Sequence, residues 1–200
     1  MRYLLMATFF FISGWTSAQD FDRFFTVSWD INVPATSTSW IDGTSLSGAK
    51  FGYRGMVSDR IAAGFDVSWA VYNKYYPPDT FTSPDGAITT DYFNYIYSYG
   101  FMASGQYFLP SSNPKIMPYA GIGLGAALNR FAQYYNIYTD ADDSWGFVAR
   151  PEVGVLLPFG SKVGVTAAVH YDYTTAGSDT FNYSGFNHYG FSIGLALMTY

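Results

Sequence analysis

Residues 25–33 read Phe-Thr-Val-Ser-Trp-Asp-Ile-Asn-Val, so that each apolar side chain is followed by a polar one. Because neighbouring side chains of an extended strand point to opposite faces, this alternation predicts a β-strand with one apolar and one polar face. The same period of two returns along the chain. It predicts seven further strands, within residues 51–57, 61–71, 93–102, 120–129, 146–157, 163–173 and 189–197.

The segments between the predicted strands alternate between short and long. Short turns are expected at residues 58–60, 110–114 and 158–161, and long loops at 34–47, 74–91, 136–145 and 174–187. Three short turns and four long loops in this order are typical of an up-and-down antiparallel barrel, with both chain ends on the short-turn side. No linker or charge run divides the chain, so a single barrel domain over residues 19–200 is predicted.

The composition decides which face of this barrel points outward. Charged residues make up 12% of the chain and aromatic residues 21%, whereas a soluble domain has about 25% charged residues. The polar faces of the strands carry mostly small residues, which suit the narrow interior of a small barrel. These features favour a transmembrane barrel with its apolar face toward lipid over a soluble lipocalin-like barrel with its apolar face inward.

Composition also excludes several classes of function. The chain has no cysteine, which excludes disulfides and thiol chemistry. Its net charge of -5 argues against a nucleic-acid partner, because such proteins need clustered Lys and Arg. The 49% hydrophobic content excludes intrinsic disorder.

Residues 1–18 have the pattern of a cleavable secretory signal. Arg2 precedes a mostly apolar run over residues 3–12, and the small residues Ser17 and Ala18 stand before Gln19. The apolar run is about half as long as a membrane-spanning helix requires. We therefore expect a signal peptide at residues 1–18 and a mature chain that begins at residue 19.

The polar faces of the strands also carry titratable side chains that are expected to point into the lumen: Asp30, Arg54, Asp66, Arg150, Glu152, His170 and Asp172. An eight-stranded barrel is only wide enough for side chains to fill it, so a buried charge needs a partner inside. Gly121, Gly123 and Gly125 leave room for Arg150 and Glu152 on the next strand. The prediction is an ion-pair network that fills the lumen, with a narrow pore gated by Arg150 as the alternative.

Acidic residues gather in the expected long loops, and Asp140, Asp142 and Asp143 form the tightest group. Their oxygens could hold a divalent cation, although the segment lacks the Gly and the distal Glu of an EF-hand loop. A solvated acidic loop is the competing interpretation. The tyrosines within residues 72–76, 92–99 and 134–138 predict an aromatic belt at the outer interface, or alternatively a carbohydrate-binding or adhesive surface.

Three details set limits on these interpretations. Pro151 interrupts a predicted strand that has no free edge, so we expect a bulge there. Arg130 falls on the apolar face, which places it at the membrane interface. His170 and Asp172 share one strand face, but no serine stands at a spacing that completes a nucleophile and base set, so no catalytic residue, cofactor or metal is predicted.

These features together resemble a known family. The signal, the eight alternating strands, the run Pro118-Tyr119-Ala120-Gly121-Ile122-Gly123-Leu124-Gly125 after a tight turn, and the final aromatic Tyr200 are similar to small outer-membrane β-barrels of the OmpA, OmpX and OmpW type. The resemblance spans nearly all of residues 21–200 and leaves no room for a periplasmic domain. It implies a bacterial outer-membrane location with both termini periplasmic, in contact with outer-membrane lipid and lipopolysaccharide.

The resemblance also implies how the barrel is inserted. In that family the terminal strand is a recognition signal for the barrel assembly machinery, which implies such a role for Phe191 and Tyr200. Tyr200 lies on the opposite parity to Phe191, so a bulge or frayed end is expected between them.

The function predicted from the residues and the resemblance is non-enzymatic. We expect a monomeric barrel with a filled lumen and a structural or surface-interaction role through acidic, Tyr-rich extracellular loops. The alternative is a narrow OmpW-like channel for ions or small hydrophobic solutes past Arg150 and Glu152. A lipid A-modifying enzyme, in which His170 or His188 would act, is a remote alternative.

Overall fold

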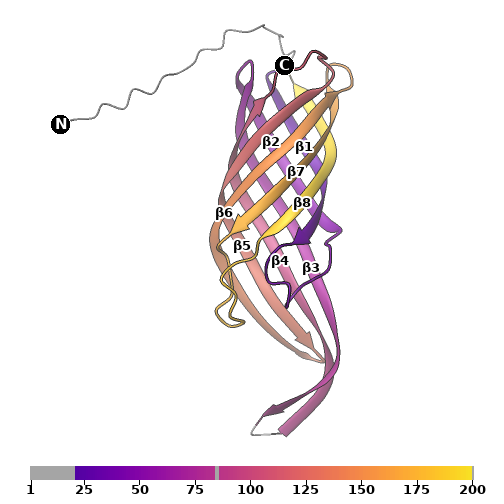
Figure 1. Ribbon diagram of the computed structural model, residues 1–200, viewed down its shortest axis with the longest axis vertical. Coiled ribbons are helices and arrows are strands. Elements are labelled where there is room, and N and C mark those ends of the chain that lie inside the picture. Colours follow the sequence, from indigo (N-terminus) through magenta and orange to yellow (C-terminus); the bar gives the residue numbers. More distant parts are fainter. Residues whose placement is uncertain (1–20, 84–85, 200) are drawn as a thin grey trace, which may run out of the picture.

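The computed structural model describes residues 21–83 and 86–199 as one closed barrel of antiparallel strands in sequence order, in which β8 pairs with β1 (Figure 1). The strands are β1 (Arg23–Pro34), β2 (Ser47–Ser58), β3 (Ile61–Ser83), β4 (Gly86–Phe108), β5 (Met117–Tyr135), β6 (Tyr138–Pro158), β7 (Val163–Thr174) and β8 (His188–Thr199). The predicted eight-stranded up-and-down barrel is therefore confirmed. Within the described residues, no helix has the length and apolar character needed to cross a membrane.

The two ends of the barrel differ in their connections. Residues 59–60, 109–116 and 159–162 form short connections at the end where β1 begins and β8 ends, as predicted (Figure 1). At the opposite end, residues 35–46 and 175–187 form two of the four predicted long loops. This second end is called the loop end below.

The other two predicted long loops, at residues 74–91 and 136–145, are wrong. β3 and β4 remain paired from Ile61↔Tyr107 to Ser83↔Gly86, and β5 and β6 remain paired out to Tyr135↔Tyr138. The first of these segments contains two tyrosines and four threonines, which favour extended structure. Pro77 and Pro78, which suggested a loop, lie at a register shift between Tyr76 and Asp79, on a stretch of β3 that has no β2 partner.

These long hairpins carry a four-stranded sheet well past the rest of the barrel (Figure 1). It is made of residues 72–83 of β3, 86–97 of β4, 129–135 of β5 and 138–145 of β6, and is called the projecting sheet below. Tyr75 and Phe93 pack side by side on it, with ring centroids 5.0 Å apart, and the rings of Tyr95 and Tyr134 meet edge to face at 5.4 Å.

The predicted bulge at Pro151 is also wrong. The β6–β7 register is the same on both sides of the proline, at Ala149↔Tyr173 and at Glu152↔His170, and only the pairs between them are missing. Proline has no backbone N–H to donate, so the ladder loses bonds there without gaining a residue. The strand continues in phase and keeps Arg150 and Glu152 on the same face.

The outward side chains of the barrel form an apolar belt. Large apolar side chains on this face are about half exposed, whereas the residues beside them in sequence are largely buried or have small side chains. Members of the belt from different strands are Val27, Phe65, Phe101, Ile122, Val153 and Leu195. The predicted orientation, apolar outward and polar inward, is therefore confirmed, and the fold is that of a transmembrane barrel.

A charge introduced into this belt tests the depth of each position. A membrane-crossing strand takes about 9–11 residues, so counting from Phe108 places Phe101 near mid-membrane and Tyr97 near the outer interface. We predict that Phe101→Arg lowers the free energy of unfolding by about 2–4 kcal/mol, and that the control Tyr97→Arg lowers it by about 0–1 kcal/mol. Reversible unfolding in lipid vesicles measures both, and equal effects of the two substitutions would contradict the assigned depths.

Candidate functional site

The inward side chains are layered along the barrel. An apolar group that includes Phe24, Phe108, Tyr119, Leu156 and Met198 is buried near the short turns, and is called the short-turn cluster. A second apolar group is buried at the loop end, and is called the loop cluster: Trp40, Ile41, Ala70, Tyr72, Ile96, Phe131 and Phe186. Buried charged side chains occupy the lumen between these two clusters.

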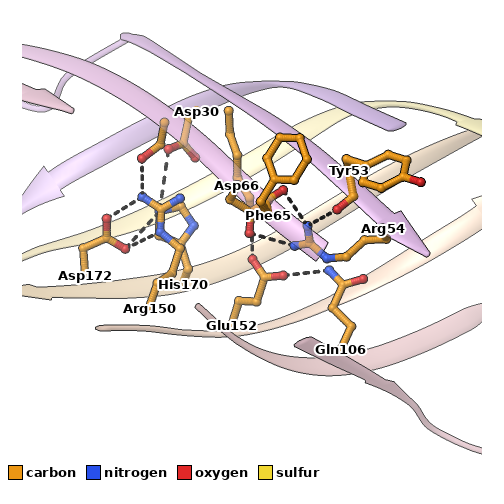
Figure 2. Close-up of polar contacts among 12 residues, drawn as sticks. Asp30, Tyr53, Arg54, Phe65, Asp66, Gln106, Arg150, Glu152, His170 and Asp172 are labelled. Atoms are coloured by element: carbon orange, nitrogen blue, oxygen red, sulfur yellow. Dashed lines mark hydrogen bonds and ion pairs between the residues drawn. The ribbon is translucent and has the colours of Figure 1, made fainter. Parts of the chain in front are cut away.

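Two neighbouring groups make up this charged layer, and Figure 2 shows them side by side. In the first group, Arg54 of β2 binds Asp66 of β3, with Nη2 2.7 Å from Oδ2. Lys50 of β2 forms an ion pair with Glu152 of β6, on another wall of the barrel. The side-chain amide of Gln106 donates a second hydrogen bond to Glu152 at 2.8 Å. Both carboxylates of this group therefore have a cationic partner.

The second group surrounds Arg150 of β6. Its guanidinium binds Asp172 of β7 through two nitrogens, with Nε 2.5 Å from Oδ1, and also donates to the hydroxyl of Ser68 at 2.9 Å. On the other side of Asp172, Nε2 of His188 lies 3.2 Å from Oδ2. A bidentate guanidinium–carboxylate pair is among the strongest polar contacts available to side chains, so it fixes both partners.

A glycine next to these charges provides the space they occupy. A Cβ atom at Gly121 of β5 would lie 3.1 Å from Cγ of Glu152. Any larger residue there would push the Glu152 side chain from its position between Lys50 and Gln106. The glycine column of β5 therefore makes room for the charged layer.

His170 and Asp30 also belong to the second group, with Nε2 of His170 3.6 Å from Oδ2 of Asp30 and 4.0 Å from Oδ1 of Asp172. All seven side chains predicted for the lumen therefore lie in these two groups, and each is buried. Sequence reasoning missed three members: Lys50, Gln106 and His188. Lys50 continues the polar positions of the alternating pattern one residue before the predicted strand at 51–57. His188 does the same one residue before the predicted strand at 189–197. Extending the alternation by one residue would have found both.

The acidic residues predicted as a cation site are not brought together. Asp140 accepts a hydrogen bond from the hydroxyl of Tyr135 at 2.6 Å, and Asp143 faces Arg130 across 3.7 Å on the other side of β6. Asp142 accepts from the Ser178 hydroxyl at 2.6 Å and from the Thr180 amide at 3.2 Å, and these bonds lower the pKa of Asp142. Asp142 thus ties the loop of residues 175–187 to the projecting sheet.

The remaining predicted residues are placed as follows. Phe191 lies on the outer face of β8 and is 43% exposed, within the apolar belt. Tyr200 and the expected signal peptide lie outside the described residues. Arg130 and Asp143 are both about half exposed on the projecting sheet, and the location of Arg130 at the membrane interface stays a prediction.

Two small cavities lie within the lumen. One is lined by side chains of the short-turn cluster together with Lys50 and Arg54, and the other lies beside Arg150, Asp172 and His188. Each offers about 10 Å³ to the centre of a water molecule, which is room for roughly one water.

Breaking one ion pair of the layer should be costly because the remaining charge stays buried. We predict that Arg54→Met, which leaves Asp66 unpaired, lowers the free energy of unfolding by about 3–5 kcal/mol. The double variant Arg54→Met/Asp66→Asn should recover a large part of this loss. Arg130→Gln, which breaks the exposed pair with Asp143, is the matched control and should change stability by less than about 0.5 kcal/mol. Equal effects of Arg54→Met and Arg130→Gln in vesicle unfolding experiments would refute the buried layer.

Comparison with known proteins adds evidence on the fold. No protein-family model matches the sequence, and no curated protein matches it significantly. Among solved structures, Neisserial surface protein A is similar over 90% of this chain and 97% of its own, with a TM-score of 0.54 and 16% identity. The Yersinia pestis attachment invasion locus protein Ail, bound to a heparin analogue, matches with a TM-score of 0.49 and 12% identity, over 88% of this chain and 96% of its own. The outer membrane protein W of E. coli matches with a TM-score of 0.44 and 18% identity, over 89% of this chain and 97% of its own. The fold of this chain is that of the small eight-stranded outer-membrane β-barrel proteins.

Proposed function

We propose that the protein is an integral outer-membrane barrel with a closed lumen, and that it acts at the cell surface by binding a protein partner through its projecting sheet. The observation that carries this proposal is the contrast between the two parts of the molecule. The lumen is packed with side chains, and three of the four buried carboxylates among the described residues are paired with Lys or Arg, whereas the projecting sheet extends beyond the barrel and presents exposed polar and aromatic side chains.

The packing of the lumen supports a closed barrel. Conduction needs a continuous path, but the short-turn cluster and the loop cluster occupy the two ends of the lumen. The ion pairs Lys50–Glu152, Arg54–Asp66 and Arg150–Asp172 occupy the middle. The cavity beside Lys50 and Arg54 and the cavity beside Arg150 and Asp172 each hold roughly one water, which is too little for a hydrated ion to pass.

The chemistry of the projecting sheet supports a protein partner. Its outer face carries Tyr75, Phe93, Tyr95 and Tyr134, whose rings pack against one another and remain partly exposed. Tyrosine is enriched at protein interfaces because its rigid ring gives contact area while its hydroxyl can still bond to water or to a partner.

The charge of the loop end indicates which partner it favours. The described residues there include seven aspartates, at positions 42, 79, 91, 140, 142, 143 and 179, but only two basic side chains, Lys74 and Arg130. Lys74 is already paired with Asp42 at 2.7 Å. Complementary potentials steer association, so this surface favours a basic protein and repels polyanions.

The same proposal includes the setting of the barrel in the membrane. Short turns face the periplasm in outer-membrane barrels, so both termini are assigned to the periplasm and the projecting sheet to the outside. Outer-membrane lipid and lipopolysaccharide surround the apolar belt, and β8 with Phe191 engages the barrel assembly machinery during insertion. We assign a monomer without a catalytic role, since both histidines of the chain are buried in the lumen, away from a substrate.

Shortening the projecting hairpin tests the surface role. Tyr72 and Ile96 are directly paired, so replacing residues 73–95 with an Asn-Gly turn keeps the register of the remaining strands. The replacement removes Tyr75, Phe93 and Tyr95 together with Asp79 and Asp91. Vesicles that carry the protein should capture basic rather than acidic proteins from a panel of defined soluble proteins, and the shortened variant should lose at least about 80% of this capture.

A variant with an equally tight turn in place of residues 110–115, at the opposite end, is the matched control and should bind like the unmodified protein. Equal capture by the shortened hairpin, or a preference for acidic proteins, would overturn the proposed surface role.

Single-channel current across a planar bilayer tests the alternative of a narrow channel in the same preparations. Silence is expected, whereas discrete steps that Arg150→Ala alters would replace the surface role with the channel.

A further inference from the structure

The second group of lumenal side chains contains an arrangement that ion pairing alone does not explain. His170 and His188 are buried with Asp30 and Asp172, on the adjacent strands β7, β8 and β1. One ligand atom from each of His170, Asp172 and His188 lies within 4.8 Å of the others. We propose that these four side chains form a site for a divalent transition-metal ion of the zinc type, independent of the surface role proposed above.

The first support is a buried histidine that lacks hydrogen-bond partners. His170 is 3% exposed, and neither of its ring nitrogens has a hydrogen-bond partner. Oδ1 of Asp30 is likewise buried without a partner, and Oδ2 accepts only a 3.2 Å bond from Asn32. Burying polar atoms without partners costs free energy, so the fold keeps them here at the expense of stability.

The distances within the group fit ligands around one ion. Nε2 of His170 lies 3.6 Å from Oδ2 of Asp30 and 4.0 Å from Oδ1 of Asp172, and both separations are too long for hydrogen bonds. Nε2 of His188 lies 3.2 Å from Oδ2 of Asp172. Ligand atoms around tetrahedral zinc, with bonds of about 2.0–2.1 Å, are about 3.3 Å apart. His170, Asp172 and His188 are therefore spaced for one centre if Asp172 gives up one of its two bonds to Arg150, and Asp30 would join them by moving toward Nε2 of His170.

The charge balance of the lumen favours an added cation. Among the described residues, the buried charged side chains are four carboxylates, Asp30, Asp66, Glu152 and Asp172, and three cations, Lys50, Arg54 and Arg150. Asp30 is the carboxylate without a Lys or Arg ion pair, and it faces His170. A divalent cation bound between Asp30 and Asp172 would give Asp30 the cationic partner it lacks, in a setting where an unpaired charge is costly, and would change the net charge of the layer from −1 to +1. A proton on the ring of His170 or His188 could also supply a positive charge beside the carboxylates. The metal-binding experiment below distinguishes a proton from a metal ion.

A glycine on β8 makes this geometry possible. Gly190 pairs with His170 on one side and with Asn32 on the other, so it stands between the imidazole and β1. A Cβ atom at Gly190 would lie 2.1 Å from Nε2 of His170 and 2.5 Å from Oδ1 of Asn32. Only glycine lets the ring lie across β8 and direct Nε2 toward Asp30.

The ligand types indicate the class of metal. Imidazole nitrogens with carboxylate oxygens suit zinc, cobalt, nickel and copper, whereas calcium and magnesium prefer oxygen ligands alone. The chain has only two histidines and no cysteine. Any metal that binds through imidazole must therefore bind at this site.

Cobalt and zinc binding to the folded protein tests the proposal. The full chain, without a histidine tag, is folded in detergent micelles with Co²⁺ present during folding and, separately, added afterwards. We expect one Co²⁺ per chain, visible absorption bands of tetrahedral cobalt, and displacement by Zn²⁺. Removal of an outer-shell partner weakens a metal site by about 10–100-fold, so His170→Gln and His188→Gln should each weaken binding by at least about 100-fold.

Three controls locate the site. Asp140→Asn/Asp142→Asn removes carboxylates of the projecting sheet and should leave binding unchanged. Gly190→Ala should weaken binding because its methyl group displaces the His170 ring, whereas at Gly105 the nearest atom to an added Cβ is 3.9 Å away, so Gly105→Ala should not. Electron paramagnetic resonance of Cu²⁺ on the unmodified protein should show coupling to imidazole nitrogen, a result that needs no folded variant.

Two results of these experiments would overturn the metal site. Absence of metal uptake under both folding conditions would overturn the proposal and leave a proton as the balancing charge. Uptake that survives loss of both histidines, or copper spectra without nitrogen coupling, would place the metal on surface carboxylates and equally overturn it.

Discussion

The structure depends on the small interior of a closed eight-stranded barrel. Side chains fill this space and little water enters, so an inward charge is costly unless another side chain of the lumen neutralises it. Arg54–Asp66 and Arg150–Asp172 provide this neutralisation between neighbouring strands, and Lys50–Glu152 provides it across the lumen, between β2 and β6. The Lys50–Glu152 pair therefore connects two strands that share no backbone ladder.

A filled lumen moves the surface available for recognition to the loop end. Four strands continue past the barrel as the projecting sheet, and the loop of residues 175–187 is held against it by hydrogen bonds from Ser178 and Thr180 to Asp142. Trp40 of the other long loop stacks on Phe181 with ring centroids 4.4 Å apart. The loops therefore close the barrel mouth and support the base of the sheet that extends beyond it.

Period-two alternation was sufficient to predict the barrel, its eight strands and seven of the titratable side chains in its lumen, because alternation follows directly from strand geometry. It could not identify the partners. Lys50 and Glu152 are far apart in sequence and meet only through the stagger of strands around the closed barrel, which no local pattern records. The long hairpins were missed for another reason: prolines and aspartates indicate loops, yet at Pro77 and Pro78 the strand has a free edge that tolerates them.

The closed lumen is tested most directly by the reactivity of single cysteines, since the natural chain has none. Ser192 faces the lumen and is 3% exposed, Ile193 faces lipid, and Thr89 lies on the projecting sheet. In vesicles, a water-soluble maleimide should label Thr89→Cys rapidly but leave Ser192→Cys and Ile193→Cys unlabelled until the barrel is denatured. Labelling of Ser192→Cys at a rate close to that of Thr89→Cys, with Ile193→Cys still protected, would reveal a water-filled lumen and contradict this account.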